Sequence, residues 1–379
     1  MFEKKHEMLR KLAREFAEKE LEPIADEAEK NGGYPKELWQ KAAKYGFGGI
    51  TIPKEYGGTG GDYKSLAIVV EEFCKKDAAA SSLLMSNSLS GAPYLYYGTE
   101  EQKQKYLKPM VLGEKIGAFA LTEPGAGSDS GATQTTCLWD ETQGCYILNG
   151  RKCFITMGPI CDYAVVFAKS NLEAKGTRGI SAFIVEAGWE GFSHGKPEEK
   201  MGMHASVTSD LVFNNVKVPK ENLLGEEGQG FKIAMGILDA GRVTVSSQGL
   251  GIAAGCLDLA VAYSKERVQF GKPICKLQDV AFKLADMATE VQATRMLVYD
   301  AADRLDRHEK VTMQAAMAKY KAGEVCNSVA YKALQIHGGY GYMQDYAIER
   351  MTRAARLVSI YEGTSEIQKL VISGHLLGR

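Results

Sequence analysis

Glu362, in the segment YEGTSEIQ at residues 361–368, is the strongest candidate for a catalytic carboxylate. Ser365 and Gln368 fit a capping box, which predicts that Glu362 lies in the loop directly before a terminal helix. The N-terminus of such a helix can receive an anion. A glutamate there becomes a useful general base when its surroundings raise its pKa, whereas a solvated loop glutamate is only a surface charge. Spacing alone leaves both interpretations open.

A second candidate loop, LTEPGAGSD at residues 121–129, follows a predicted strand. Its glycines free backbone amides, and Thr122 and Ser128 add hydroxyl groups, so the loop could hold a polar heterocycle or a phosphate. The pattern is not the dinucleotide fingerprint GxGxxG, and no parallel βαβ unit is expected around it. Without further context, an ordinary surface turn would explain it as well.

Three further segments carry aromatic, charged or glycine residues where secondary structure is expected to end. The triplet FIT, residues 154–156, follows a predicted turn at residues 149–152. Arg267 closes a predicted helix and could bind a phosphate bidentately, or it could be an ordinary exposed helix-end arginine. The paired glycines at 338 and 339 would let a cofactor approach the backbone, although a helix C-cap would also explain them.

Three regions with different secondary-structure patterns must position these loops. Residues 1–116 have mostly helical apolar spacing, with Thr99 as an expected N-cap. Residues 117–226 hold short β-rich runs at 118–121, 145–148, 163–168, 180–185 and 210–213. Residues 227–379 are helical again, in long segments such as 277–305 and 315–336, which favours a helix bundle.

Composition excludes several classes of partner. The 379 residues carry 46 basic and 47 acidic side chains, so no overall field favours nucleic acid, an anionic membrane or a polyanion. The charged start MFEKKHEMLRKL is unlike a signal peptide, and no run approaches 18 uncharged apolar residues, so we expect a cytoplasmic protein without a membrane span. Eight cysteines lie without a CxxC pair or zinc-ligand spacing, which predicts reduced thiols and no metal site.

Taken in order, these segments resemble the acyl-CoA dehydrogenase family over essentially the whole chain. The match rests on ALTEPGAGSDSGA, KxFIT, GMHASVTSDLVFNNVKVPKENLLGEEGQGF, LDAGR, ERVQFGKPI, QIHGGYGY and IYEGTSEIQKLVISGHLLGR, and it is closest to the short-chain, or butyryl-CoA, dehydrogenases. The resemblance implies an α+β, mainly α fold. It would comprise an N-terminal helical domain (1–116), a central β-barrel-like domain (117–226) and a C-terminal four-helix bundle (227–379), assembled as a homotetramer, a dimer of dimers.

The resemblance also implies FAD, held between the β domain and the bundle. The residues expected to contact FAD are Phe119, Leu121, Thr122, Gly127, Ser128, Phe154, Ile155, Thr156, Arg267, Gln278, Gln335, Gly338, Gly339, Thr364 and Glu366. Arg267 and Gln278 would reach the pyrophosphate and adenine end of FAD across a subunit interface, joined by Gln335, Gly338, Gly339, Thr364 and Glu366. The residues expected to contact an acyl-CoA substrate are Ser128, Asp239, Arg242 and Gly363.

The implied reaction is an α,β-dehydrogenation of an acyl-CoA thioester. Glu362 would remove the α-proton, flavin N5 would accept the β-hydride, and electrons would pass to electron-transfer flavoprotein. Such a base needs an apolar pocket that raises its pKa. The thioester oxygen would accept a hydrogen bond from the Glu362 N–H. Some family members carry the base on the helix that corresponds to residues 239–242; here Gly241 is small enough to leave room for Glu362.

This chain departs from the family pattern at three places. Phe154 stands where tryptophan is usual and Met157 where asparagine is usual, which affects shielding of the flavin. His337 stands where short-chain relatives often have an aliphatic residue, and a solvated or core histidine is the plain interpretation.

Three alternatives stay open at this stage. The first is an acyl-CoA oxidase on the same fold, a class that usually carries a further C-terminal domain. The second is an enoyl-CoA reductase, including one for aryl substrates, because sequence does not determine direction or acyl chain. The third is an FAD-binding scaffold without turnover, which the near-neutral charge and the presence of Glu362 disfavour.

Overall fold

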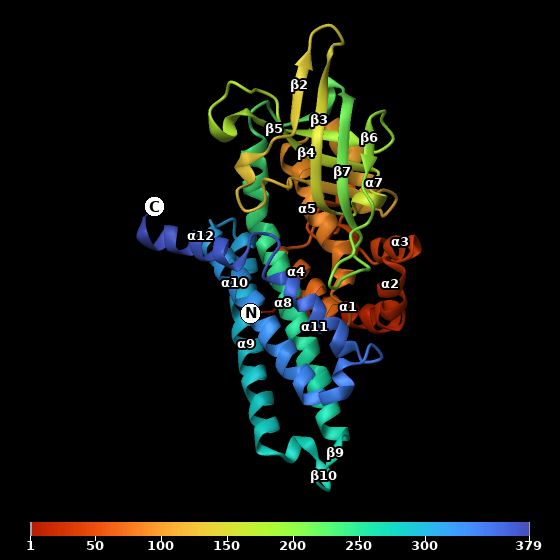
Figure 1. Cartoon of the computed structure of the whole chain (residues 1–379), viewed down its shortest axis with the longest axis vertical. Helices are drawn as coiled ribbons and strands as arrows, with labels where there is room; N and C mark the ends of the chain where they lie inside the picture. Colours follow the sequence, from red (N-terminus) through yellow and green to blue (C-terminus); the bar gives the residue numbers. More distant parts are fainter. Residues whose placement is uncertain (1, 379) are drawn as a thin grey trace.

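The computed structural model describes residues 2–378 and contains a helical region, a β-sheet region and a long helix bundle (Figure 1). The expected fold class is confirmed. The first region holds α1 (Lys4–Phe16), α2 (Ala25–Asn31), α3 (Lys36–Lys44), α4 (Tyr63–Cys74), α5 (Ser82–Tyr97), α6 (Glu100–Gln102) and α7 (Lys108–Val111). Thr99 caps α6 as predicted, because its hydroxyl accepts from the N–H of Gln102 and the Gln102 side chain accepts from the Thr99 N–H.

The strands lie between Gly117 and Leu224, above the bundle in Figure 1. They are β1 (Gly117–Ala120), β2 (Thr136–Asp140), β3 (Cys145–Thr156), β4 (Tyr163–Lys169), β5 (Ile180–Glu186), β6 (Phe192–His194), β7 (Thr208–Val218) and β8 (Leu223–Leu224). The sheet order is β6-β7-β3-β2-β4-β5-β8, and β1 pairs with β4 in parallel. Sequence reasoning missed β2, β6 and β8.

The side chains of β4 point alternately into two different hydrophobic cores, one on each face of the sheet. Val165 and Phe167 pack into a core shared with α5, α7 and the first turns of the long bundle helix, whereas Ala164, Val166 and Ala168 face the other side of the sheet. Both faces are therefore covered, which explains why this strand reads as a continuous apolar run rather than as an alternating one.

One predicted turn is wrong. Asn149 and Gly150 do not separate two strands but lie inside the continuous strand β3, which pairs with β7 on both sides of them. The pairing register shifts between Leu148 and Gly150, and Gly150 has φ +146°. A Cβ at this position would lie 2.5 Å from Thr135 Oγ1, so the glycine accommodates a bulge and a close approach rather than a reversal of the chain.

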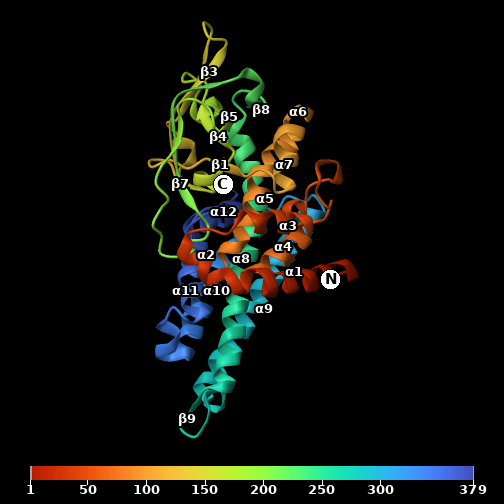
Figure 2. The same ribbon diagram turned by 90° about the vertical axis from the view of Figure 1, so that its right-hand side faces the viewer.

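The C-terminal region is a bundle of long helices with a final helix that extends away from it (Figure 2 shows the same arrangement from the side). Its elements are α8 (Gly230–Glu266), the hairpin strands β9 (Val268–Gln269) and β10 (Lys272–Pro273), α9 (Gln278–Asp306), α10 (Thr312–His337), α11 (Ala347–Val358) and α12 (Ser365–Leu377). By length and composition α8 could cross a membrane, yet 72% of its most apolar window is buried inside the protein. It is the one such helix within residues 2–378.

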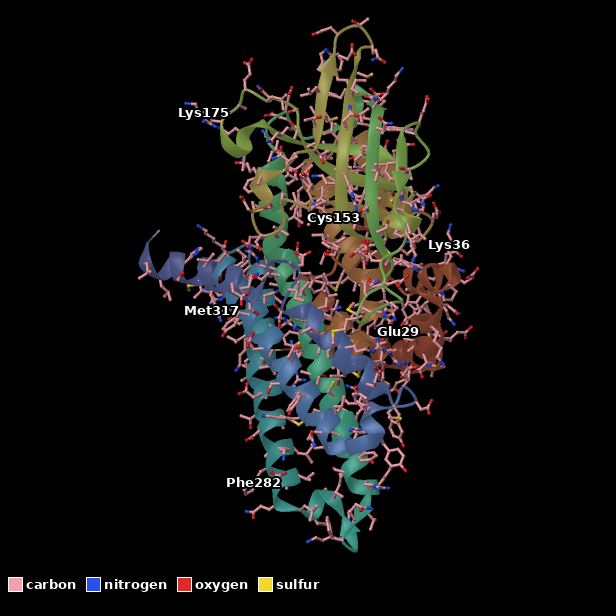
Figure 3. All side chains as sticks on the ribbon, viewed as in Figure 1. Glu29, Lys36, Cys153, Lys175, Phe282 and Met317 are labelled. Carbon is pink, nitrogen blue, oxygen red and sulfur yellow. The ribbon has the colours of Figure 1, made fainter. Side chains whose placement is uncertain are left out.

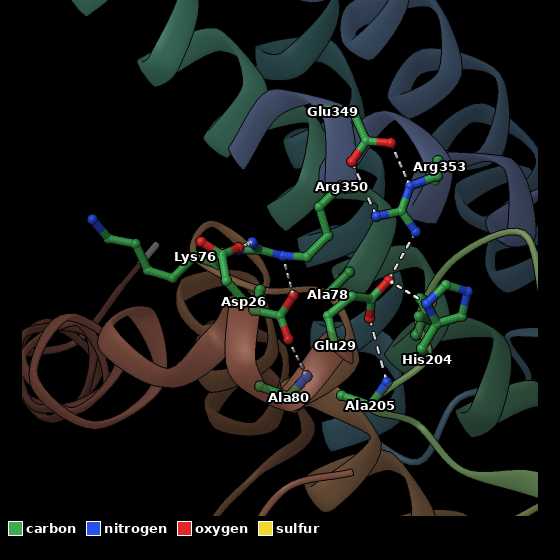
Figure 4. A network of polar contacts seen from close by, with 12 residues as sticks. Asp26, Glu29, Lys76, Ala78, Ala80, His204, Ala205, Glu349, Arg350 and Arg353 are labelled. Atoms are coloured by element: carbon green, nitrogen blue, oxygen red, sulfur yellow. Dashed lines mark hydrogen bonds and ion pairs between the residues drawn. The ribbon is translucent and has the colours of Figure 1, made fainter. Parts of the chain in front are cut away.

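A partly buried ionic network joins the three regions (Figure 4). The Arg353 guanidinium on α11 donates to Glu29 Oε1 on α2 at 2.9 Å and to the Met201 carbonyl, in the loop after β6, at 3.1 Å. Glu29 also accepts from the Ala205 N–H at 3.3 Å. Since Glu29 is largely buried and doubly paired, the contact fixes the loop of the β domain against the bundle.

All eight cysteines are free, and six of them are buried. His337 is a core histidine: it is buried, its Nδ1 lies 2.8 Å from the Ala333 carbonyl, and its ring stacks on Tyr263.

Candidate active site

Glu362 lies in the short loop between α11 and α12, in an unusual backbone conformation. Its φ is +53°, a left-handed value that costs energy for a residue with a Cβ, and Gly363 continues with φ +86°. The turn brings the carboxylate against α8, where a Cβ on Gly241 would lie 3.0 Å from Glu362 Oε2. Glycine at 241 therefore provides the space for Glu362, as the family resemblance implied.

The predicted N-cap of α12 is displaced by one residue, and the reciprocal bond of a capping box cannot form there because the third helical residue is Ile367. Thr364, not Ser365, is the N-cap of α12, and its hydroxyl accepts from the Ile367 N–H at 3.3 Å. The Ser365 hydroxyl instead donates to Glu324 Oε1 on α10 at 3.1 Å. A tertiary partner on α10 thus draws Ser365 away from the local capping role that its spacing suggested.

The carbonyl groups of the loop are held by two side chains. Gln368 Nε2 donates to the carbonyls of Glu362 at 3.1 Å and Gly363 at 2.9 Å. Lys319 Nζ on α10 donates to the Gly363 carbonyl at 2.6 Å. These bonds offset the strain of the left-handed turn and fix the direction in which Glu362 points.

The carboxylate of Glu362 has the electrostatic character of a base. Its Oε2 is buried and has no hydrogen-bond partner among residues 2–378. Burial raises the pKa of Glu362 to about 7, while the positive charges of Arg242 and Lys319 pull it downward. A free oxygen that titrates near neutrality can accept a proton in this place.

Arg242 and Asp239 lie one turn apart on α8 and pair with each other. Arg242 Nη1 donates to Asp239 Oδ1 at 2.7 Å, and Thr312 donates to Asp239 Oδ2 at 2.6 Å. The buried Nε of Arg242 is left without a partner in the part of the chain that the structure describes. The Nε of Arg242 and the Oε2 of Glu362 are therefore a buried donor and a buried acceptor without partners among the described residues. Such groups are typical of a site that a polar ligand completes.

Sequence reasoning missed two buried residues at this site. Lys319 is fully buried, and the available signal was a charged residue on the alanine-lined face of α10, between Ala315 and Ala322. Gln248 on α8 is also fully buried; its Oε1 accepts from the Tyr361 hydroxyl and its Nε2 donates to Ser81 Oγ at 2.8 Å. No local pattern identifies Gln248, because its partners come from distant segments.

The loop after β1 is rigid at its base and open at its tip. Lys152 on β3 is fully buried and donates to Glu123 at 2.7 Å and to the Leu121 carbonyl at 2.9 Å. The Thr122 carbonyl accepts from the Cys153 N–H at 2.9 Å; Cys153 is labelled on β3 in Figure 3. At the tip, Gly127 is exposed and a Cβ there would contact nothing.

The other residues expected around a flavin ring differ in exposure. Phe119 is half-buried and packs on Phe167 with ring centroids 4.9 Å apart. Phe154 is 67% exposed and has φ +57°, beside a register shift of β3, whereas Ile155 is buried and Thr156 is half-buried. Exposed aromatic surface beside free hydroxyls and open glycine backbone is the chemistry that a planar, polar-edged heterocycle requires, so these residues fit FAD.

Arg267 and the glycine pair do not lie near Glu362 within one chain. Arg267 follows α8, about 40 Å along the helix axis from Gly241 at 1.5 Å per residue. Its guanidinium carbon lies 5.3 Å from the centre of the Tyr340 ring, at a hollow of about 540 Å³ that Gly338 and Gly339 also line. Gln278 and Gln335 are exposed at this same end of the bundle.

The remaining predicted residues flank the start of α12. Thr364 is half-buried, and Glu366 is exposed in the first turn of the helix. The structure thus brings Glu362, Gly363, Asp239 and Arg242 into one place and leaves the Arg267 group at the far end of the bundle. The contacts of all these residues with cofactor and substrate stay predictions.

Comparison with known proteins gives matches along the whole chain. Residues 3–114, 118–216 and 228–377 match the N-terminal, middle and C-terminal domains of acyl-CoA dehydrogenase. The caffeyl-CoA reductase-Etf complex subunit CarC of Acetobacterium woodii is 54% identical over 99% of both chains, and a 3-(aryl)acrylate reductase of Clostridium sporogenes is 53% identical over 99% of both. The butyryl-CoA dehydrogenase structure of Megasphaera elsdenii superposes with a TM-score of 0.96 at 48% identity, covering 100% of this chain and 99% of that one.

Proposed function

Because this chain belongs to the acyl-CoA dehydrogenase family, we propose that it catalyses the α,β-dehydrogenation of an acyl-CoA thioester, or the reverse reduction of a 2-enoyl-CoA. The observation that carries the proposal is the buried, unpaired Oε2 of Glu362, whose pKa is raised to about 7. A carboxylate of this kind is suited to the weakly acidic α-proton of a thioester.

Glu362 takes the α-proton in the dehydrogenation direction and returns it in the reduction direction. Its carboxylate is held by a turn that Lys319 and Gln368 fix, so the oxygen is aimed before the substrate arrives. The backbone N–H of Glu362 donates to no group within residues 2–378. This free N–H can donate to the thioester oxygen and stabilise the negative charge that develops there.

FAD, when bound, supplies the hydride acceptor. Residues Phe119, Leu121, Thr122, Gly127, Ser128, Phe154, Ile155 and Thr156 would hold its ring at the edge of the β domain. Ser128, Asp239, Arg242 and Gly363 would contact the acyl-CoA. The buried Arg242 Nε offers one donor for that contact.

The names of two kinds of relative indicate which substrates and which redox partner to propose for this chain. The relatives named above include reductases of caffeyl-CoA and of 3-(aryl)acrylate, and a butyryl-CoA dehydrogenase. We therefore propose a short acyl chain, with or without an aryl group at its β-carbon, as the substrate. One relative is named as a subunit of a complex with Etf, which supports electron-transfer flavoprotein as the redox partner.

The experiment that tests this function is an anaerobic titration of the purified flavoprotein. Butyryl-CoA and 3-arylpropionyl-CoA are added to the oxidised enzyme, and the matching 2-enoyl-CoA compounds to the reduced enzyme. We expect one of the saturated thioesters to bleach the visible absorbance of the flavin, and its enoyl product to restore it. A flavin that responds to none of these thioesters would contradict the proposal.

A homotetramer with subunit-spanning FAD sites is the assembly that we propose. The hollow beside Arg267 is lined by exposed apolar side chains, among them Phe270 at 89% and Met343 at 48% exposure. Phe282, labelled near the lower end of α9 in Figure 3, is a further exposed apolar side chain, at 60%. Exposed apolar groups of this size are typical of a surface that a partner covers.

Replacing Arg267 should weaken retention of FAD more than it alters the chemistry. A charge-assisted hydrogen bond to phosphate contributes about 1.5–3 kcal/mol, so Arg267→Ala should bind FAD roughly 10- to 100-fold more weakly. Flavin content after gel filtration and the flavin-reduction rate of the loaded fraction are the two measurements. The control is Arg307→Ala, which removes an exposed arginine at the end of α9. Equal flavin content in Arg267→Ala and the parent would contradict the assignment.

A further inference from the structure

Lys319 is a buried ammonium group whose one hydrogen-bond partner among residues 2–378 is a backbone carbonyl. Its side chain has no exposed surface, and its Nζ donates to the Gly363 oxygen at 2.6 Å. Within the described residues it forms no ion pair shorter than 4.0 Å, unlike Lys152, which lies 2.7 Å from Glu123. Met317, labelled in Figure 3, marks this stretch of α10.

Burying this charge is costly, and a hydrogen bond to Gly363 does not by itself require a charge. Desolvation lowers the pKa of Lys319 to about 8, although the charge of Glu362 acts in the opposite direction. The neutral amide of Gln368 already donates to the same carbonyl at 2.9 Å. A neutral donor could therefore replace Lys319 if holding the loop were its only role, so the charge itself needs an explanation.

The charged groups around Lys319 explain why a charged side chain stands at this position. Glu362, in the loop, exerts the largest favourable effect on the charged form of Lys319, and Arg242 on α8 opposes it. Cys326 on the same helix and Glu366 on α12 contribute as well. Two cations act on Glu362, and Arg242 is already paired with Asp239 at 2.7 Å. Lys319 is the one that makes no direct contact with a carboxylate in the part of the chain that the structure describes.

We propose that Lys319 is a positioning residue for proton transfer: its hydrogen bond to Gly363 fixes the left-handed turn at Glu362, and its positive charge favours the carboxylate form of Glu362. This role rests on the proposed function of Glu362 as the base. Lys319 does not exchange a proton with the substrate in this account. It sets the direction and the ionisation of the residue that does.

The variants separate the charge from the hydrogen bond. Lys319→Met removes both, Lys319→Gln keeps a donor without the charge, and Lys319→Arg keeps both. Lys321→Met is the matched control, because Lys321 lies on the same helix and pairs at the surface with Glu290. Flavin content and the apparent melting temperature report whether each variant folds.

The readout is the pH dependence of flavin reduction by a saturated acyl-CoA in a single turnover. Removing a cation makes the Glu362 carboxylate less favourable and raises its pKa, so the base form appears only at higher pH. In the parent, the rate of flavin reduction rises with pH as Glu362 loses its proton; this part of the profile is called the rising limb. We expect the rising limb to move to higher pH by about one unit in Lys319→Met and Lys319→Gln, so that flavin reduction below pH 7 is roughly tenfold slower than in the parent. Lys319→Arg and Lys321→Met should keep the parental limb.

Three results would overturn the proposal. A parental limb in both Lys319→Met and Lys319→Gln would show that the charge does not act on Glu362. A lower rate without any displacement of the limb would show a structural role only. Loss of fold in all three Lys319 variants would show the same. If the parent itself is not reduced by any acyl-CoA, the proposed function fails instead, which distinguishes the two failures.

Discussion

Glu362→Gln should lose flavin reduction by a saturated acyl-CoA while keeping its fold and its FAD. The substitution preserves the volume of the side chain and removes only the group that titrates. The hydrogen bonds that hold the turn come from Lys319 and Gln368 to backbone carbonyls, so they should survive. General-base catalysis typically contributes about 10²- to 10⁴-fold, and we expect the rate to fall by at least that range.

The matched control for this variant is Glu366→Gln, four residues further along. Glu366 is exposed in the first turn of α12, and on this account it lies at the cofactor rather than at the α-carbon. Its variant should therefore retain proton abstraction. Single-turnover reduction under anaerobic conditions gives both rates. A near-parental rate in Glu362→Gln would mean that the base lies elsewhere.

The pH dependence of the parent enzyme should carry the signature of Glu362. Since burial raises its pKa to about 7, the base form is scarce below that pH and abundant above it. Flavin reduction by a saturated acyl-CoA should therefore rise about tenfold per pH unit below pH 7 and level off above it. Enoyl-CoA reduction needs the protonated acid, so its rate should stay level below about pH 7 and fall about tenfold per pH unit above it.

Opposite slopes in the two directions distinguish this residue from a general effect of pH on folding or binding. The measurement is stopped-flow flavin absorbance with saturating thioester between about pH 5.5 and 9. The residual rate of Glu362→Gln should lack the limb near pH 7. A parental profile that is flat across this range, or that has the same slope in both directions, would contradict the raised pKa as the source of activity.

Much of the fold could be predicted because its signals are local. Helical spacing located the long helices, and the capping box at Thr99 is formed as expected. The apolar run of β4 located a strand that is buried on both faces. Asn149 and Gly150 were misleading because a turn signal and a bulge signal share the same residues, and only pairing with β7 decides between them.

The candidate site was predictable where a motif carried it and not where tertiary contacts did. The room that Gly241 leaves for Glu362 was implied by the family resemblance, and the structure shows it. The N-cap at Thr364 did not follow, because Glu324 on another helix binds Ser365. Lys319 escaped prediction because its role depends on a carbonyl 44 residues away in sequence.

The most direct test of the central claim is exchange of the α-hydrogens of an acyl-CoA with solvent deuterium. The thioester, chosen by the anaerobic titration, is incubated in excess with the enzyme in D₂O without an electron acceptor, and the recovered compound is analysed by mass spectrometry. We predict deuterium at the α-carbon with the parent and with Glu366→Gln, and none above background with Glu362→Gln. Exchange by Glu362→Gln at the parental rate would show that another group removes the α-proton.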